Sequence, residues 1–131
     1  MSIIKKLLIN MIKITVDEAY AFDYYAILQI KKEYGSNVDE NIELIKSDLI
    51  NSVGLEKFNQ IINSKIYSNL YESNKETFKA VDKAKTDEVL ASYVDKCNYK
   101  RMILKKELQN KFFSNSLSEA KLGYEKLLFN E

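Results

Sequence analysis

The absence of proline is the feature that most constrains the fold of this chain. None of its 131 residues is proline, and its three glycines, Gly35, Gly54 and Gly123, fall between segments whose apolar residues recur every three or four positions. Proline breaks helix interiors and glycine commonly ends helices, so this distribution favours helices joined by short connections. We therefore predict an all-α fold, a compact bundle of five or six helices that forms one domain over residues 1–131.

Capping signals and apolar periodicity locate the expected helices. Thr15 and Glu18 have the spacing of a capping box, so the first long helix is expected to begin there and to run to Tyr34. Basic side chains before position 85 and acidic ones after position 86 predict a break between two long helices, although one helix over 64–113 would satisfy the same periodicity. The remaining helices are expected over residues 38–53, 55–63, 64–85 and 87–113, with a last one that opens at Ser116.

The first 14 residues are ambiguous. Ile12 and Ile14 alternate with polar residues, as in a short extended segment, whereas residues 2–11 fit one or two amphipathic helical turns. We treat residues 1–14 as an extension or contact segment. Asn10 interrupts the apolar run and no small-residue cleavage site follows, so we expect no signal peptide, and no apolar run is long enough for a membrane span.

The composition excludes several kinds of chemistry. The chain has no histidine and one cysteine, Cys97, which removes Ser-His-Asp and Cys-His catalysis and zinc sites of the cysteine/histidine type. We assign no catalytic residue, no cofactor and no metal ligand, because helix caps and solvated charges explain the acidic residues. A single cysteine cannot form an intramolecular disulfide, which fits the reducing cytoplasm. Heavy use of lysine, asparagine and isoleucine is typical of an AT-rich genome, such as that of a bacterium or a virus.

Arg101, the only arginine among the 20 basic residues, falls on an apolar stripe of the expected helix over residues 87–113. The stripe alternates steps of three and four, and its members are Leu90, Val94, Cys97, Arg101, Leu104, Leu108 and Phe112. A guanidinium cannot lose its charge, so a buried one needs carboxylate or carbonyl partners. Three interpretations stay open: a side chain at the stripe's edge whose head reaches water, an internal ion pair with Asp23, or a clamp for an anionic ligand.

Polar residues on three of the expected helices form the candidate ligand site. Asn98 precedes Arg101 by three positions, so the two lie on one helix face. Asp23 lies on the same side of its helix as the inner apolar residues, and Asn74 is the polar exception on the stripe of the helix over 64–85. We therefore predict Arg101, Asn98, Asp23 and Asn74 as the ligand-binding residues.

Aromatic and apolar residues near the N-terminus are the predicted contact residues. Four aromatic residues fall between positions 20 and 25 and cannot all face the core, so Tyr24 or Tyr25 is expected to meet solvent or another subunit. Ile3 and Leu7, in the N-terminal segment, complete the predicted interface.

The sequence best fits a small soluble accessory, adaptor or assembly protein of the cytoplasm. It would act through protein–protein contacts, either with a partner protein or as a homo-oligomer. The alternative is an enzyme or small-ligand binder with an anion-binding pocket between helices around Arg101, Asn98 and Asp23. A second alternative is a nucleic-acid-binding accessory protein, which the net charge of +1 disfavours.

Overall fold

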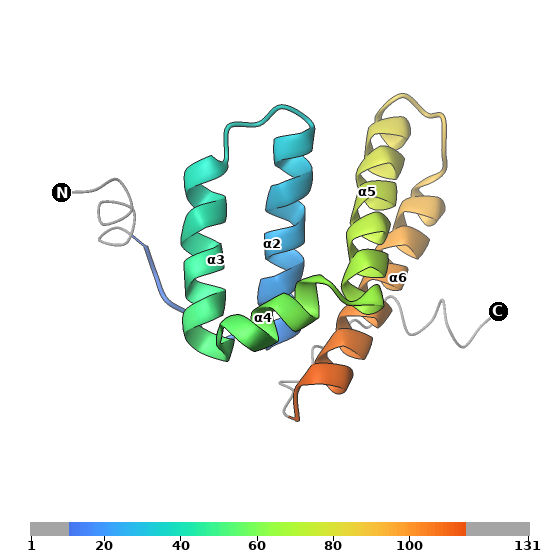
Figure 1. The fold of residues 1–131 in the computed structure, drawn as a ribbon. Coiled ribbons are helices and arrows are strands. Elements are labelled where there is room, and N and C mark those ends of the chain that lie inside the picture. The colour runs from blue at the N-terminus through green and yellow to red at the C-terminus, as the bar shows by residue number, and fades with distance from the viewer. Residues whose placement is uncertain (1–10, 115–131) are drawn as a thin grey trace.

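A computed structural model describes residues 11–114, and this part of the chain is all-helical, without strands (Figure 1). The helices are α2 (Glu18–Glu33), α3 (Asp39–Val53), α4 (Leu55–Ile62), α5 (Lys65–Lys85) and α6 (Ala91–Phe112). The predicted all-α bundle is confirmed. The expected helix that opens at Ser116 and the predicted contact residues Ile3 and Leu7 lie outside the described residues. None of the helices in the described part is long and apolar enough to cross a lipid bilayer.

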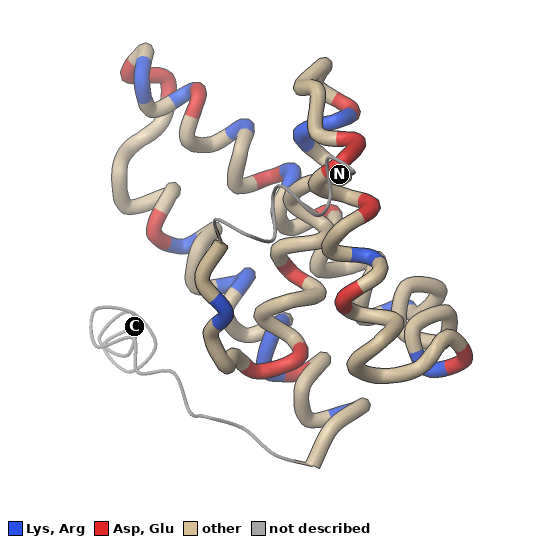
Figure 2. The backbone as a smooth tube through the Cα atoms, turned by 90° about the vertical axis from the view of Figure 1, so that its left-hand side faces the viewer, with Lys and Arg blue, Asp and Glu red and all other residues tan. Residues whose placement is uncertain are grey.

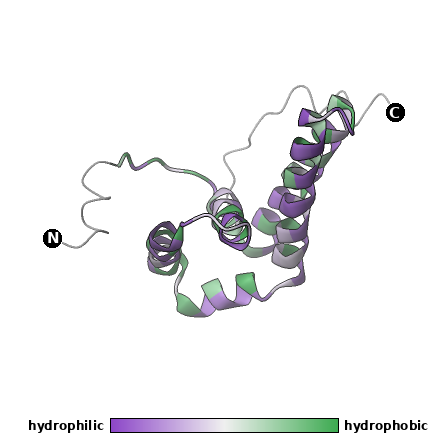
Figure 3. Ribbon diagram, turned by 90° about the horizontal axis from the view of Figure 1, so that it is seen from above, coloured by the Kyte–Doolittle hydropathy of each residue, from purple (hydrophilic) through white to green (hydrophobic). Residues whose placement is uncertain are grey.

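Two helical hairpins and one short crossing helix make up the bundle. α2 and α3 form one hairpin, α5 and α6 form the other, and α4 crosses the lower end between them (Figure 1). Seen from above, α2 lies between α3 and the α5–α6 hairpin (Figure 3). α2 contacts α3, α5 and α6, and α4 contacts α3 and α5 and also packs Phe58 against α2. α2 is therefore the central helix, with neighbours on two opposite sides.

Glycine and turn residues end the helices close to the predicted places. Gly35 and Gly54 have φ angles of 95° and 89°, a region that favours glycine, and they follow α2 and α3 as expected. α5 ends at Lys85 and α6 begins at Ala91, and Asp87 in the turn between them has a φ of 58°. The break near 85–86 is confirmed, and the alternative of one helix over 64–113 is wrong.

The start of α2 differs from the sequence prediction. The helix begins at Glu18 with Asp17 as its N-cap, so the capping box expected from Thr15 does not form. The Glu18 carboxylate instead accepts a hydrogen bond from Gln109 of α6. Leu90 is a second departure, because it precedes α6 and is 76% exposed, so the apolar stripe does not extend to it. A contact with α6 takes up the Glu18 carboxylate, and the turn between α5 and α6 places Leu90 before the start of α6.

The apolar core lies around the lower half of α2. Phe22 packs against Phe58 of α4 with ring centroids 6.1 Å apart, and Tyr25 meets the same ring edge-on at 5.8 Å. Leu70 of α5 and Leu108 of α6 are completely buried in the same cluster. The core therefore ties α4 and both hairpins to α2, and it holds α5 and α6 close to the polar residues of α2.

Candidate functional site

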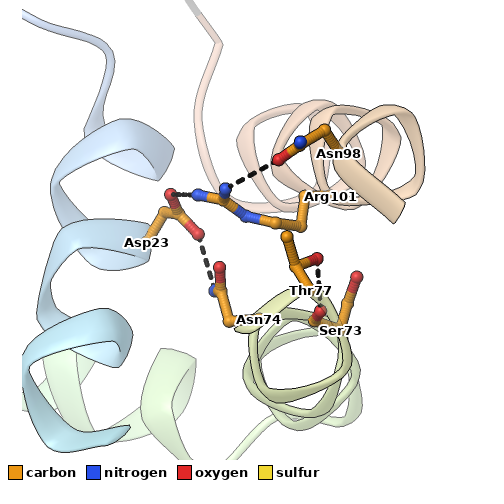
Figure 4. A network of polar contacts seen from close by, with 6 residues as sticks. All are labelled: Asp23, Ser73, Asn74, Thr77, Asn98 and Arg101. Carbon is orange, nitrogen blue, oxygen red and sulfur yellow. Dashed lines mark hydrogen bonds and ion pairs between the residues drawn. The ribbon is translucent and has the colours of Figure 1, made fainter. Parts of the chain in front are cut away.

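Four polar side chains from three helices meet between α2, α5 and α6 (Figure 4). Arg101 of α6 donates from Nη2 to Oδ2 of Asp23 on α2 at 2.8 Å. Asn74 of α5 donates from Nδ2 to the other carboxylate oxygen, Oδ1, also at 2.8 Å. A longer contact of 3.3 Å joins Nη1 of Arg101 to Oδ1 of Asn98. The structure thus brings together all four residues predicted as a ligand site, and we call them the polar network.

The polar network is largely shielded from water. The side chain of Asp23 is 6% exposed and that of Arg101 is 21% exposed, while Asn74 is buried. Removing a carboxylate from water is costly unless its oxygens receive hydrogen bonds. Both oxygens of Asp23 have a donor, one of them charged, so this cost is offset. Of the three interpretations of Arg101, the internal ion pair with Asp23 is the one that the structure contains.

Two buried polar atoms beside the network have no hydrogen-bond partner within residues 11–114. They are Nε of Arg101 and the hydroxyl oxygen of Ser73. Thr77, on the same helix as Ser73, donates from its hydroxyl to the Ser73 carbonyl at 2.9 Å, so its own donor is used locally. Within the described residues, one guanidinium N–H of Arg101 and the hydroxyl of Ser73 are therefore buried without a hydrogen-bond partner beside the network.

Gln109 is a buried polar residue that was not predicted from the sequence. Its Oε1 accepts from the backbone N–H of Ala19 at 2.9 Å, and its Nε2 donates to the Glu18 carboxylate at 3.0 Å. The first amides of a helix lack partners inside the helix, so Gln109 caps α2 from another helix. Glutamine is common on exposed helix faces, and the only sequence signal was its place next to Leu108 of the apolar stripe.

A second row of polar contacts joins α2 to α5. Tyr67 donates to Gln29 at 2.6 Å, and Tyr71 donates to Glu33, whose carboxylate also pairs with Lys75 at 2.9 Å. Burial raises the pKa of the Tyr67 hydroxyl far above its ordinary value. The hydrogen bond from Tyr71, followed by the one from Lys75, lowers the pKa of Glu33. These contacts extend the polar side of α2 from Asp23 to the last turn of the helix.

The two predicted contact tyrosines have opposite environments. Tyr24 is 43% exposed, as one of the pair was expected to be. Tyr25 lies in the core against Phe58, so it offers no contact surface, and its burial raises its pKa. The reason is helical spacing, because Tyr25 follows Phe22 by three positions and shares its inward face. The other exposed large apolar side chains beside or on this helix are Met11, Ile12, Ile14, Tyr20 and Tyr34.

The described residues contain no cluster of three or more acidic, cysteine or histidine side chains that could hold a metal ion. Cys97 is buried and carries a free thiol. Comparisons of the chain with models of protein families, with curated protein sequences and with solved structures give no match.

Proposed function

We propose that this protein is a small helical accessory or assembly protein that acts through protein–protein contacts. The observation that carries the proposal is the exposure of large apolar side chains within residues 11–24. Ile12 and Ile14 are 89% and 76% exposed, and the rings of Tyr20 and Tyr24 are about half exposed. We call these four residues the apolar patch. Large exposed apolar side chains that lie close together in the sequence are common at surfaces that another protein covers.

The geometry of the patch supports a helical or groove-like partner. Tyr20 and Tyr24 are four positions apart on α2, so their rings lie one above the other on one helix face. Ile12 and Ile14 lie in the extended segment that leads directly into the same helix. The Lys105 ammonium lies 5.2 Å from the centre of the Tyr20 ring. A partner with an apolar surface bordered by carboxylates therefore matches the patch.

The polar network supports the same proposal in preference to the binding of a small anion. An anionic ligand would use the fork of Arg101, and the Asp23 carboxylate already holds one of its nitrogen donors at 2.8 Å. A ligand would have to displace this carboxylate, which accepts from Asn74 as well. The buried charged groups are thus already paired with each other and join α2 to α6. The buried free thiol of Cys97 fits a reducing compartment, and we propose the cytoplasm.

Site-specific photocrosslinking in the cells that make the protein tests this proposal. A photoreactive phenylalanine analogue replaces Tyr24 in one variant and Tyr34, an exposed tyrosine just after the C-terminal end of α2, in the matched control. We expect a discrete crosslinked protein, either a partner or a second copy, at position 24 and not at position 34. A second variant with Ile14→Asp, in addition to the crosslinker at position 24, should lose that product. Equal products at both positions, or none at position 24, would overturn the proposal.

A further inference from the structure

The nearly neutral chain consists of an acidic half and a basic half. Residues 18–53, which form α2 and α3, hold seven acidic and three basic residues, a net charge of −4. Residues 65–112, which form α5 and α6, hold eleven basic and seven acidic residues, a net charge of +4. The whole chain has a net charge of only +1. The charges along both hairpins can be followed in Figure 2.

The two charges are concentrated on the outer helices. The exposed basic residues of α6 are Lys96, Lys100, Lys106 and Lys111, and we call them the basic face. Three exposed acidic residues of α3, Asp39, Glu40 and Glu43, lie within about 100° of one another around the helix, and we call them the acidic face. The exposed Asp48 lies on the side of α3 opposite to Asp39. Ion pairs within the molecule already involve two members of these faces, because Lys32 pairs with Asp39 at 2.8 Å and Lys100 pairs with Glu76 at 3.3 Å. Lys46 is the one basic residue of α3, and Asp95 and Glu107 are the acidic residues of α6. Figures 1 and 3 place α3 and α6 at opposite edges of the fold.

We propose that the acidic face of one copy docks on the basic face of a second copy. Because the two faces lie on different edges, each contact leaves one acidic and one basic face free for further copies. Such a head-to-tail contact builds a ring if the rotation closes and a filament if it does not. Tyr99 and Ile103, half-buried on α6 between the lysines, supply apolar area within the contact.

A second copy fits the basic face better than a nucleic acid does. A nucleic acid would also meet the acidic half of the molecule, and the acidic residues interspersed on α6 lower the local positive charge. A second copy presents the exposed acidic face to the basic face. The net charge of its α2–α3 hairpin, −4, is equal in size and opposite in sign to that of the α5–α6 hairpin. Charges at exposed faces are screened by salt, so the self-association is weak and disappears as the ionic strength rises.

Charge reversal provides a test in which two defects cancel. One variant carries Lys96→Glu and Lys106→Glu on the basic face, and another carries Glu40→Lys and Glu43→Lys on the acidic face. We expect the full-length wild-type protein to self-associate at low ionic strength in sedimentation velocity, and each variant to do so about tenfold more weakly or less, because like charges then meet. A mixture of the two variants should associate again, since each reversed face fits the reversed face of the other protein.

A matched control separates the docking faces from net charge. Lys65→Glu and Lys79→Glu change two exposed residues of α5 by the same total charge. This variant should keep most of the self-association, and circular dichroism verifies that all variants are folded. A monomeric wild-type protein at low ionic strength, a mixture that stays monomeric, or a control as defective as the basic-face variant would overturn the proposal. So would a monomer that binds a single-stranded oligonucleotide through Lys96 and Lys106. None of these outcomes affects crosslinking at Tyr24, so the two proposals fail separately.

Discussion

The two sides of α2 are packed by different kinds of interaction. Toward α4, the side chains in contact are aromatic, with Phe22 and Tyr25 around Phe58. Toward α5 and α6, the contacts include an ion pair and amide hydrogen bonds that begin at Asp23 and the N-terminus of α2. Apolar contacts stabilise without strong directional demands, whereas buried polar groups need particular partners at particular distances. We infer that the aromatic side supplies stability and that the polar side fixes how the second hairpin is placed.

The largest expected effect lies on the aromatic side. Phe58→Ala should lower the free energy of unfolding by about 3–5 kcal/mol, because it removes a ring that is almost completely buried between two others and leaves a cavity. Chemical denaturation followed by circular dichroism measures this loss. Phe58→Leu is the control and should cost distinctly less, since it keeps much of the apolar volume. Equal losses for both variants would contradict a packing role and point to a steric or aromatic requirement.

On the polar side, the expected cost depends on which partner is removed. Asp23→Ala should cost about 3 kcal/mol, because it strands the Arg101 guanidinium without its carboxylate, and water reaches only part of that group. The double variant Asp23→Leu with Arg101→Met removes both charges and should cost much less than the sum of Asp23→Leu alone and Arg101→Met alone. A double-mutant cycle from denaturant unfolding measures the difference. Strictly additive losses of unfolding free energy would mean that Asp23 and Arg101 do not interact. The polar side of α2 would then lack the coupled contacts that distinguish it from the aromatic side.

The cap from α6 should give a smaller effect. Gln109→Ala leaves the Ala19 amide and the Glu18 carboxylate without their partner from α6 and should cost about 1–3 kcal/mol. Amide hydrogen exchange, measured by nuclear magnetic resonance, should speed up at Ala19 more than in the middle of α2. Asn110→Ala, at the next and exposed position, is the control and should change stability by less than about 0.5 kcal/mol. Uniformly faster exchange along α2 would mean that Gln109 acts on the whole core and not as a cap.

The comparison also separates what the sequence predicted from what it did not. Periodicity and glycine placement predicted the helices and their ends, because these depend on residues three or four positions apart. Arg101, Asp23 and Asn74 were all identified in the same way, because each is a polar residue among apolar residues spaced three or four positions apart on one helix face. Local patterns therefore located both the aromatic side and the centre of the polar side.

Contacts between distant segments are where sequence reasoning stopped. The capping box expected at Thr15 depends on neighbours in the chain. It does not form, and the Glu18 carboxylate instead accepts a hydrogen bond from Gln109, 91 positions later. Tyr25 is a different case, because its place three positions after Phe22 is a local signal that it faces α4, and the count of aromatic residues alone did not use it. Gln109 itself carries no local signal, because its partner is a helix end that exists only after the bundle has formed. Long-range partners of this kind are decided by tertiary packing.

The smallest expected effect concerns pH and lies at the far end of the polar side. Burial raises the pKa of Tyr67, so the folded protein holds this proton more tightly than the unfolded chain does. Its contribution is therefore constant below the ordinary value of 10.0 and is lost as the pH rises above it. Tyr67→Phe should cost about 1 kcal/mol at neutral pH, through the lost bond to Gln29, and should flatten the alkaline fall in stability.

Gln29→Ala is the control for this last effect, because it removes the same hydrogen bond and keeps the buried hydroxyl. It should lower stability at neutral pH by a similar amount while the alkaline fall stays, since burial is the main cause of the raised pKa. Thermal unfolding between neutral pH and pH values above 10.0 measures both quantities. If both variants flattened the alkaline fall equally, the hydrogen bond and not burial would hold the proton. Hydrogen-bond partners would then determine the stability contributed by the polar side along the whole of α2. Burial from water would be decisive only on the aromatic side.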